Sequence, residues 1–199
     1  MISHRGSGEI QLTITIPLWL VRIIIQPALL YRRLRYGYPF CRIPLTQGKF
    51  AIVDPDDFLR LSKRNWYAVK GCSTFYAVGT VFKEGKGHRL PMHREVLRVA
   101  DDMFVDHINH NGLDNRKANL RPATSAQNTY NRKKRSGYKG VSFDKNRGLW
   151  RASIACCGKR EFLGHFGDKR EAAKAYDRAA IQYHGQFASL NFPGKSVEG

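Results

Sequence analysis

Short apolar runs separated by turn residues occupy most of the chain, and most of them predict strands rather than long helices. One such run ends at Asp54-Pro55, which is typical of a strand that meets a turn. Two further runs, rich in aromatic and β-branched residues, lie close together and predict a hairpin. The strands predicted in this part are 50–53, 66–69 and 75–78. Apolar residues at helical spacing predict short helices over 56–62 and 92–99.

The C-terminal third contains three short apolar runs with turns between them, followed by one helix. The runs predicted as an antiparallel meander are 138–143, 150–154 and 161–166. The helix over 169–184 begins after Asp168 as N-cap and ends at Gly185. Its inner face is rich in alanine, with Tyr176 and Tyr183 expected in the core, so the helix can lie close to the sheet. The pattern predicts an α+β fold.

Residues 1–42 carry apolar stretches that are too broken to match one template. Pro17, Arg22, Gln26 and Pro27 interrupt them. A membrane span needs about 20 apolar residues in a row, so a span is not expected here, and no signal-peptide cleavage site follows. A peripheral amphipathic segment, a strand that binds a partner, and sequence upstream of the true start all remain open. No protein partner is inferred.

The charge of the chain indicates a polyanionic partner. Lys and Arg number 34 against 16 Asp and Glu, a net charge of +18, which favours nucleic acid. Residues 132–199 contain 15 basic and 6 acidic residues and the remainder is equally positive, so both halves can contact a phosphate backbone. An apolar content of 42% excludes a wholly disordered chain. The four cysteines form no C-x-x-C pair, which argues against a zinc site and fits a reducing cytoplasm.

The stretch 105–128 carries the candidate chemistry. Asp106 and His107 end an apolar run and precede a polar loop, and a second extended piece lies at 119–121. Thr124 with Gln127 has the spacing of a capping box, so a helix begins there. A strand, a loop, a second strand and a helix that pack together would bring polar side chains from all of them to one point.

Three of these side chains suit hydrolysis assisted by a metal ion. Asp106 and Asn128, which lies in the first turn of the predicted helix, offer the oxygen ligands that a hard cation such as Mg²⁺ prefers. A neutral His107 beside them can take a proton from water, because its ordinary pKa lies near the operating pH.

The same residues carry a family resemblance. The segments 106–109, 119–121 and 127–128, together with 43–54 and 92–94, resemble HNH endonucleases of the phage and mobile-intron homing branch. That resemblance implies a small mixed nuclease domain with a ββα-metal motif, which acts on double-stranded DNA and uses Mg²⁺, with Mn²⁺ as the alternative.

Roles for individual residues follow from this resemblance. It implies that Asp106 and Asn128 are metal ligands, that His107 is the general base, and that Asn119 is the middle catalytic-site residue, which ties the loop together. Many relatives carry histidine where this chain has Asn128, which implies looser metal binding. His93 and Arg94 match a recurrent His-Arg pair of the family, and packing and phosphate contact both stay open for them.

The C-terminal part resembles the plant ethylene-response-factor (APETALA-type) DNA-binding domain. The resemblance is carried by 138–141, Trp150, 162–164, 171–177 and 190–193. It implies a three-stranded antiparallel sheet, packed on one α-helix, that lies in the major groove. The residues expected to contact DNA, including those of the basic linker, are Arg132, Lys133, Lys134, Arg135, Lys139, Ser142, Trp150, Arg151, Ser153, Arg160, Phe162 and His165. For Trp150 and Phe162, core packing stays open as the alternative. Several arginines of the plant domains are absent here, so the plant target sequence is not expected.

Together these features predict a metal-dependent, sequence-specific DNA endonuclease of the homing type. The expected bounds are 1–42 for a segment of unknown role, 43–131 for the nuclease, 132–137 for a basic linker, 138–193 for the recognition domain and 194–199 for a tail. The resemblance implies a cytoplasmic protein encoded by a phage or bacterium, or delivered to a host cell. A non-cleaving DNA-binding regulator with a decayed nuclease half is the alternative, and a general RNA-binding protein is a third.

Overall fold

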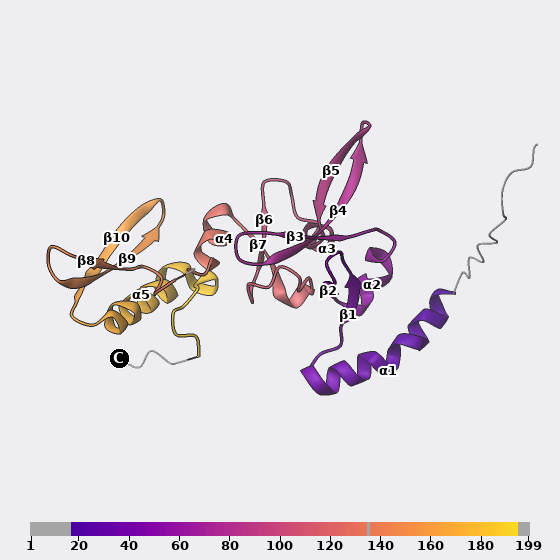
Figure 1. Ribbon diagram of the computed structural model, residues 1–199, viewed down its shortest axis with the longest axis horizontal. Coiled ribbons are helices and arrows are strands. Elements are labelled where there is room, and N and C mark those ends of the chain that lie inside the picture. The colour runs from indigo at the N-terminus through magenta and orange to yellow at the C-terminus, as the bar shows by residue number, and fades with distance from the viewer. Residues whose placement is uncertain (1–16, 135, 195–199) are drawn as a thin grey trace, which may run out of the picture. The chain divides into compact units, whose positions relative to one another are not determined.

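The computed structural model describes residues 17–134 and 136–194 (Figure 1). Two compact units make up the chain, residues 1–40 and residues 41–199. The second unit contains four small antiparallel sheets and all of the helices except the first. The prediction of a mixed α+β fold is confirmed.

The first unit is built around one helix that the sequence pattern did not predict. Helix α1 (Leu18–Tyr36) continues through Pro27 and ends at Gly37, which adopts the left-handed conformation at φ 82° and donates its backbone N–H to Arg33. Over residues 18–36 the segment is therefore a helix and not a partner-binding strand. Among the residues that the structure describes, no helix is long and apolar enough to cross a membrane.

The second unit begins with small sheets and short helices, as the sequence predicts. Its first elements are β1 (Cys41–Pro44), β2 (Phe50–Val53), α2 (Pro55–Leu61), β3 (Tyr67–Lys70), β4 (Phe75–Lys83), β5 (Lys86–Pro91) and α3 (Met92–Leu97). Strands β1 and β2 form one hairpin, and β3, β4 and β5 form a meander. The β4–β5 hairpin projects outward (Figure 1). The sequence pattern predicted only its beginning, the strand over 75–78. Val53, Leu61 and Met92 are at most 1% exposed and form the centre of this part.

A strand pair and a short helix follow and position the candidate site. They are β6 (Phe104–His107), the 3₁₀ turn η1 (Lys117–Asn119), β7 (Leu120–Ala123) and α4 (Ser125–Asn131). Strands β6 and β7 pair antiparallel, which places Asp106 opposite Arg121. The capping box is confirmed: Thr124 accepts from the Gln127 backbone N–H, and the Gln127 side chain accepts from the Thr124 N–H.

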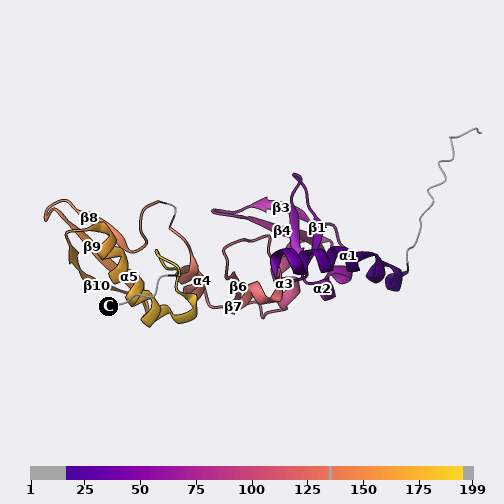
Figure 2. The ribbon, with the colours of Figure 1, turned by 90° about the horizontal axis from the view of Figure 1, so that it is seen from below.

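The C-terminal part is the predicted meander with its helix. Strands β8 (Val141–Asp144), β9 (Leu149–Cys156) and β10 (Lys159–Phe166) lie in the order β10-β9-β8, followed by α5 (Lys169–His184) and the 3₁₀ turn η2 (Gly185–Phe187). Helix α5 runs along one face of this sheet (Figure 2). Alanines at 172, 173 and 180 are fully buried, which lets the helix approach the strands closely.

Two tyrosines of α5 were expected in the core, and one of them is not there. Tyr176 is 3% exposed and packs against Ile154, as predicted. Tyr183 is 38% exposed and its hydroxyl donates to Glu161 at the sheet edge, so that prediction was wrong. The phenolic hydroxyl finds a charged acceptor at the surface, whereas the position of Tyr176 faces the strands.

Candidate active site and nucleic-acid interface

A pocket of about 810 Å³ opens where β6, α4 and the β3–β4 turn meet. Three of the four residues predicted for the catalytic centre line it, namely Asp106, His107 and Asn128. Two cations at the end of α4, Arg132 and Lys133, line the same pocket. The rest of the lining is Cys72, Ser73, Thr74, Tyr76, Asn109, His110, Asn111 and Asn131.

Asp106 is a buried carboxylate that two neighbours hold in place. Arg121 donates from Nε to Oδ2 at 2.8 Å, and its Nη2 lies 2.6 Å from the same oxygen. Asn131 donates from Nδ2 to Oδ1 at 2.8 Å and to the His107 backbone carbonyl at 3.1 Å. Oδ2 therefore has two contacts with the Arg121 guanidinium, whereas Oδ1 accepts a single hydrogen bond and keeps a second lone pair.

Neither Arg121 nor Asn131 was predicted as a site residue, although both leave a signal in the sequence. Arg121 is the cross-strand partner of Asp106 once the β6–β7 register is known. Asn131 lies three residues after Asn128, and residues at that spacing share one face of a helix. Arg121 lies in a predicted motif without a role of its own, and Asn131 was not predicted.

His107 is held in a nearly closed environment. It is 6% exposed, and its Nε2 lies 3.4 Å from Oδ1 of the buried Asn115. The rings of Tyr76 and His93 pack edge-on against it, with centroids 5.8 and 5.1 Å away. Burial lowers the pKa of His107, although the hydrogen bond that its ring donates to Asn115 and the charge of Asp106 act in the opposite direction. The imidazole is thus kept neutral and able to accept a proton.

The structure places His93 and Arg94 in packing contacts. Burial, the neighbouring His107 and Arg94 lower the pKa of His93 to about 3, so its ring stays uncharged. Arg94 donates to the backbone carbonyls of Met103 and Ala100, at 2.6 and 2.9 Å. Of the two alternatives left open, the geometry favours packing over phosphate contact for both residues.

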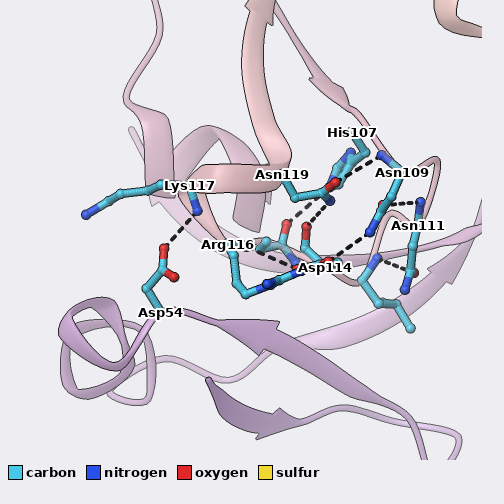
Figure 3. Close-up of polar contacts among 10 residues, drawn as sticks. Asp54, His107, Asn109, Asn111, Asp114, Arg116, Lys117 and Asn119 are labelled. Atoms are coloured by element: carbon cyan, nitrogen blue, oxygen red, sulfur yellow. Dashed lines mark hydrogen bonds and ion pairs between the residues drawn. The ribbon is translucent and has the colours of Figure 1, made fainter. Parts of the chain in front are cut away.

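Asn119 lies beneath the loop rather than in the pocket. Its Oδ1 accepts from the Asn109 backbone N–H at 3.0 Å, and its Nδ2 donates to the Asp114 carbonyl at 2.8 Å (Figure 3). Asp114 is itself bound by Arg116 and by the Asn109 amide. Because Asn119 is 5% exposed, these bonds have no competition from water, and they fix the path of the loop from His107 to β7.

A second set of contacts anchors η1 to α2. The Lys117 backbone N–H donates to Asp54 at 2.8 Å (Figure 3), and the Lys117 ammonium lies 3.0 Å from Asp57. The Ile52 N–H donates to the Leu113 carbonyl and the Asn115 N–H donates to the Ile52 carbonyl, which ties the same loop to β2. The small N-terminal sheet therefore supports the loop that carries Asn115.

The donor set in the pocket fits a hard divalent cation. Within 17–134 and 136–194, no group of three or more His, Cys, Asp and Glu side chains could hold a metal ion. The available ligands are the free lone pair of Asp106 Oδ1 and the amide oxygen of the half-buried Asn128. Mg²⁺ keeps several waters and needs only one or two carboxylates, so this sparse oxygen set matches its coordination.

The sheet of the C-terminal part presents one face away from α5. Alternation places Ala152 and Ile154 toward the helix and Arg151 and Ser153 on the opposite side. Cross-strand pairing adds further predicted residues to that outer face. Its predicted DNA-contacting members are Ser142, Arg151, Ser153, Arg160, Phe162 and His165. The guanidinium of Arg151 lies 5.6 Å from the ring centre of Phe162, which is 51% exposed.

Three of the side chains expected to contact DNA make contacts within the protein instead. Trp150 lies two residues before Ala152 in β9, so both side chains are on the side of the sheet that faces α5, and Trp150 packs against the core there. The Lys139 ammonium donates to the backbone carbonyls of Tyr130 and Arg132 at the end of α4, and burial lowers the pKa of Lys139 to about 8. The Lys134 ammonium donates to two backbone carbonyls at the start of the C-terminal part.

Two further linker cations, Arg132 and Lys133, are exposed at the pocket. Arg135, also predicted to contact DNA, lies outside the described residues.

Comparisons with known proteins agree with this geometry. Residues 88–130 match the family model of an HNH endonuclease, which covers β6, β7 and most of α4. An uncharacterized HNH endonuclease of Acanthamoeba polyphaga mimivirus is 31% identical over 153 residues, which is 73% of this chain and 76% of that protein. The chain belongs to the HNH endonuclease family. Protein 3.8 of Escherichia phage T7 is 35% identical over 94 residues, 45% of this chain and 77% of that protein.

The C-terminal part of this HNH protein has relatives of its own. Residues 136–186 match the family model of the AP2 domain. An AP2-like ethylene-responsive transcription factor of Arabidopsis thaliana is 46% identical over 61 residues, 31% of this chain but only 13% of that factor. The chain therefore combines an HNH endonuclease region with an AP2 region, as both resemblances implied. Below, residues 41–131 are called the HNH region and residues 136–194 the AP2 region.

Proposed function

We propose that this protein is a metal-dependent, sequence-specific DNA endonuclease of the homing type. One observation carries the proposal: Asp106, His107 and Asn128 line a single pocket, and Arg132 and Lys133 line it too. A general base, oxygen ligands for a cation and two phosphate-binding side chains are the groups that hydrolysis of a phosphodiester needs.

His107 is the proposed general base. With the Asn115 carbonyl oxygen as acceptor, the Nε2 position carries the proton and Nδ1 is free to accept another. His107 takes a proton from water as the water oxygen bonds to phosphorus and the bond from phosphorus to the 3′ oxygen breaks. The products are a 5′-phosphate and a 3′-hydroxyl, whose proton comes from solvent.

Asp106 and Asn128 are the proposed ligands of a divalent cation, Mg²⁺ first and Mn²⁺ as the alternative. A cation bound there would neutralise the negative charge that develops on the phosphate and the leaving oxygen. Arg121 and Asn131 fix the carboxylate of Asp106, and Asn119 fixes the loop that brings Asn115 to His107. Residues that hold ligands in this way affect metal affinity nearly as strongly as the ligands do.

The AP2 region is proposed to choose the sequence. Its outer sheet face carries Arg151, Arg160 and the exposed ring of Phe162, which can contact base edges and thymine methyl groups. Arg132 and Lys133 contact phosphates and set the register between recognition and cutting. The net charge of +18 favours binding to duplex DNA at low salt.

The test is cleavage of a pooled random-sequence library in supercoiled DNA, with and without Mg²⁺. Wild type is compared with His107→Ala and with His88→Ala, a matched change at an exposed histidine of β5. We expect metal-dependent breaks near a shared sequence in wild type and His88→Ala, and none in His107→Ala, with binding kept in all three. Preferred binding without cuts in Mg²⁺ and Mn²⁺ would overturn the proposal and favour a non-cleaving regulator.

A further inference from the structure

Arg121 touches both regions of the protein. On the HNH side its Nε and Nη2 reach Oδ2 of Asp106, at 2.8 and 2.6 Å. On the AP2 side its Nη1 donates to the Gln186 backbone carbonyl at 2.6 Å, and its guanidinium lies 4.0 Å from the centre of the Phe187 ring. The Arg121 side chain is 12% exposed and that of Asp106 is 6% exposed, so the contact between the two is largely shielded from water.

A separate set of contacts supports the same junction. The rings of Tyr130 in α4 and His184 in α5 stack at 3.8 Å with an angle of 6° between their planes. His184 is fixed in turn by a 2.8 Å hydrogen bond between its Nε2 and the Ala155 carbonyl of β9. The Lys139 ammonium donates to the last carbonyls of α4. Helix α4, which carries Asn128, is thus held by the AP2 region.

The η2 turn fixes the orientation of the Arg121 guanidinium toward Asp106. An arginine often pairs with a carboxylate through two parallel hydrogen bonds, one to each oxygen, as Arg116 does with Asp114 through Nε and Nη2. Arg121 is held differently, by the hydrogen bond from Nη1 to the Gln186 carbonyl and by the Phe187 ring, and in that orientation Nε and Nη2 both meet Oδ2. Oδ1 keeps the lone pair that a cation requires.

We propose that Arg121 is a positioning residue through which the η2 turn of the AP2 region keeps Asp106 in the form that binds metal. The proposal rests on the proposed function, because it takes Asp106 as a metal ligand. Without η2, the guanidinium is free to rotate and pair with both oxygens of Asp106, and metal binding weakens. The recognition region thereby completes the nuclease site.

The experiment measures Mn²⁺ binding to the full-length protein without DNA, by electron paramagnetic resonance of the free ion. Phe187→Leu keeps an apolar side chain but removes the ring beneath Arg121. Its matched control is Phe143→Leu in β8, whose ring packs on Trp150 and lies outside both proposed sites. Changes in residues that orient metal ligands cost about 10–100-fold in affinity. We expect about tenfold weaker binding for Phe187→Leu and no change for Phe143→Leu.

Further variants test the role of η2 separately from the metal site itself. Arg121→Lys should also weaken Mn²⁺ binding about tenfold, and the double variant Arg121→Lys/Phe187→Leu should be no weaker than Arg121→Lys alone, because one contact is removed twice. Asp106→Asn should abolish binding. If it does, while a folded Phe187→Leu protein binds Mn²⁺ like wild type, the role of η2 is wrong. If Asp106→Asn still binds Mn²⁺, the proposed metal site is wrong and this inference fails with it. Thermal unfolding verifies that each variant is folded.

Discussion

Replacing Asn119 by alanine tests whether this residue acts as a structural tie for the active-site loop. The side chain is 5% exposed and makes two hydrogen bonds, one with the Asn109 backbone N–H and one with the Asp114 carbonyl. Alanine removes both partners; it leaves the Asp114 carbonyl buried without one, whereas the Asn109 N–H is only partly buried. Asn119 does not line the pocket, so any effect on cleavage must pass through the loop.

The size of the effect follows from these two bonds. A buried polar group that loses its partner costs about 1–3 kcal/mol, so loss of the bond to the Asp114 carbonyl alone lowers the local stability of the loop by about that much. A change of about 1.4 kcal/mol is tenfold in an equilibrium constant, so the open form of the loop should become at least about fivefold more populated. Cleavage should fall because Asn115, which orients His107, lies in the same loop.

Hydrogen exchange measured by mass spectrometry reports the opening directly, on peptides that span residues 105–121. The matched control is Asn65→Ala, the same chemical change at an exposed asparagine that does not line the pocket. Because Asn65 is exposed, the cost should stay within about 0.5 kcal/mol. We expect faster exchange and slower cleavage for Asn119→Ala only, with unchanged DNA binding.

Two results would refute this reasoning. Equal exchange rates in Asn119→Ala and wild type would show that the two hydrogen bonds do not hold the loop. Lost cleavage with unchanged exchange would show that Asn119 acts on the reacting atoms and not as a tie.

The remaining predictions concern stability. Burial raises the pKa of Asp57, but hydrogen bonds and charges from Arg60 and Lys117 outweigh it and lower the pKa below its ordinary value of 3.8. The stabilisation is present above that value and lost as the pH falls through the folded pKa, so Asp57→Asn should cost about 2 kcal/mol at pH 7 and progressively less below pH 3.8 in urea unfolding. Gly140→Ala would place a methyl group 1.9 Å from an aromatic ring of α5 at a φ of 73°, and should cost about 3 kcal/mol or more. Gly148→Ala, at a similar φ in open space, should cost about 1 kcal/mol; equal melting temperatures for these two glycine variants would contradict the clash.

Local signals allowed much of the fold to be predicted. The capping box of α4 and the N-cap of α5 depend on residues three positions apart, and both are present. The three strands of the AP2 region also follow from short apolar runs and their turns. Helix α1 was missed because Pro17, Arg22 and Pro27 interrupt its apolar pattern, although Pro27 lies inside the helix. Proline and charge are local penalties that a long helix can tolerate.

Only those residues of the candidate site that belong to one sequence motif could be predicted. Asp106, His107 and Asn128 come from such a motif, and the structure brings them to one pocket. Asn131 and Arg121 act through partners 25 and 15 positions away, so their roles depend on strand register and helix packing. For Trp150 both core packing and DNA contact were open, because a resemblance names positions on a strand and not the side that each one faces; the structure shows core packing, on the side that the alternation with Ala152 indicates.

Helix α4 is seven residues long and contacts both parts of the protein. Asn128 and Asn131 line the nuclease pocket, and Tyr130 stacks on His184 of the AP2 region. This sets a limit on how such proteins can be recombined, in evolution or in the laboratory. An exchange of recognition regions at the basic stretch 132–137 would separate α4 from the surface it packs on. A functional chimaera should therefore keep the aromatic stacking partner at the end of α5 and the turn at 185–187, even when every base-reading residue is replaced.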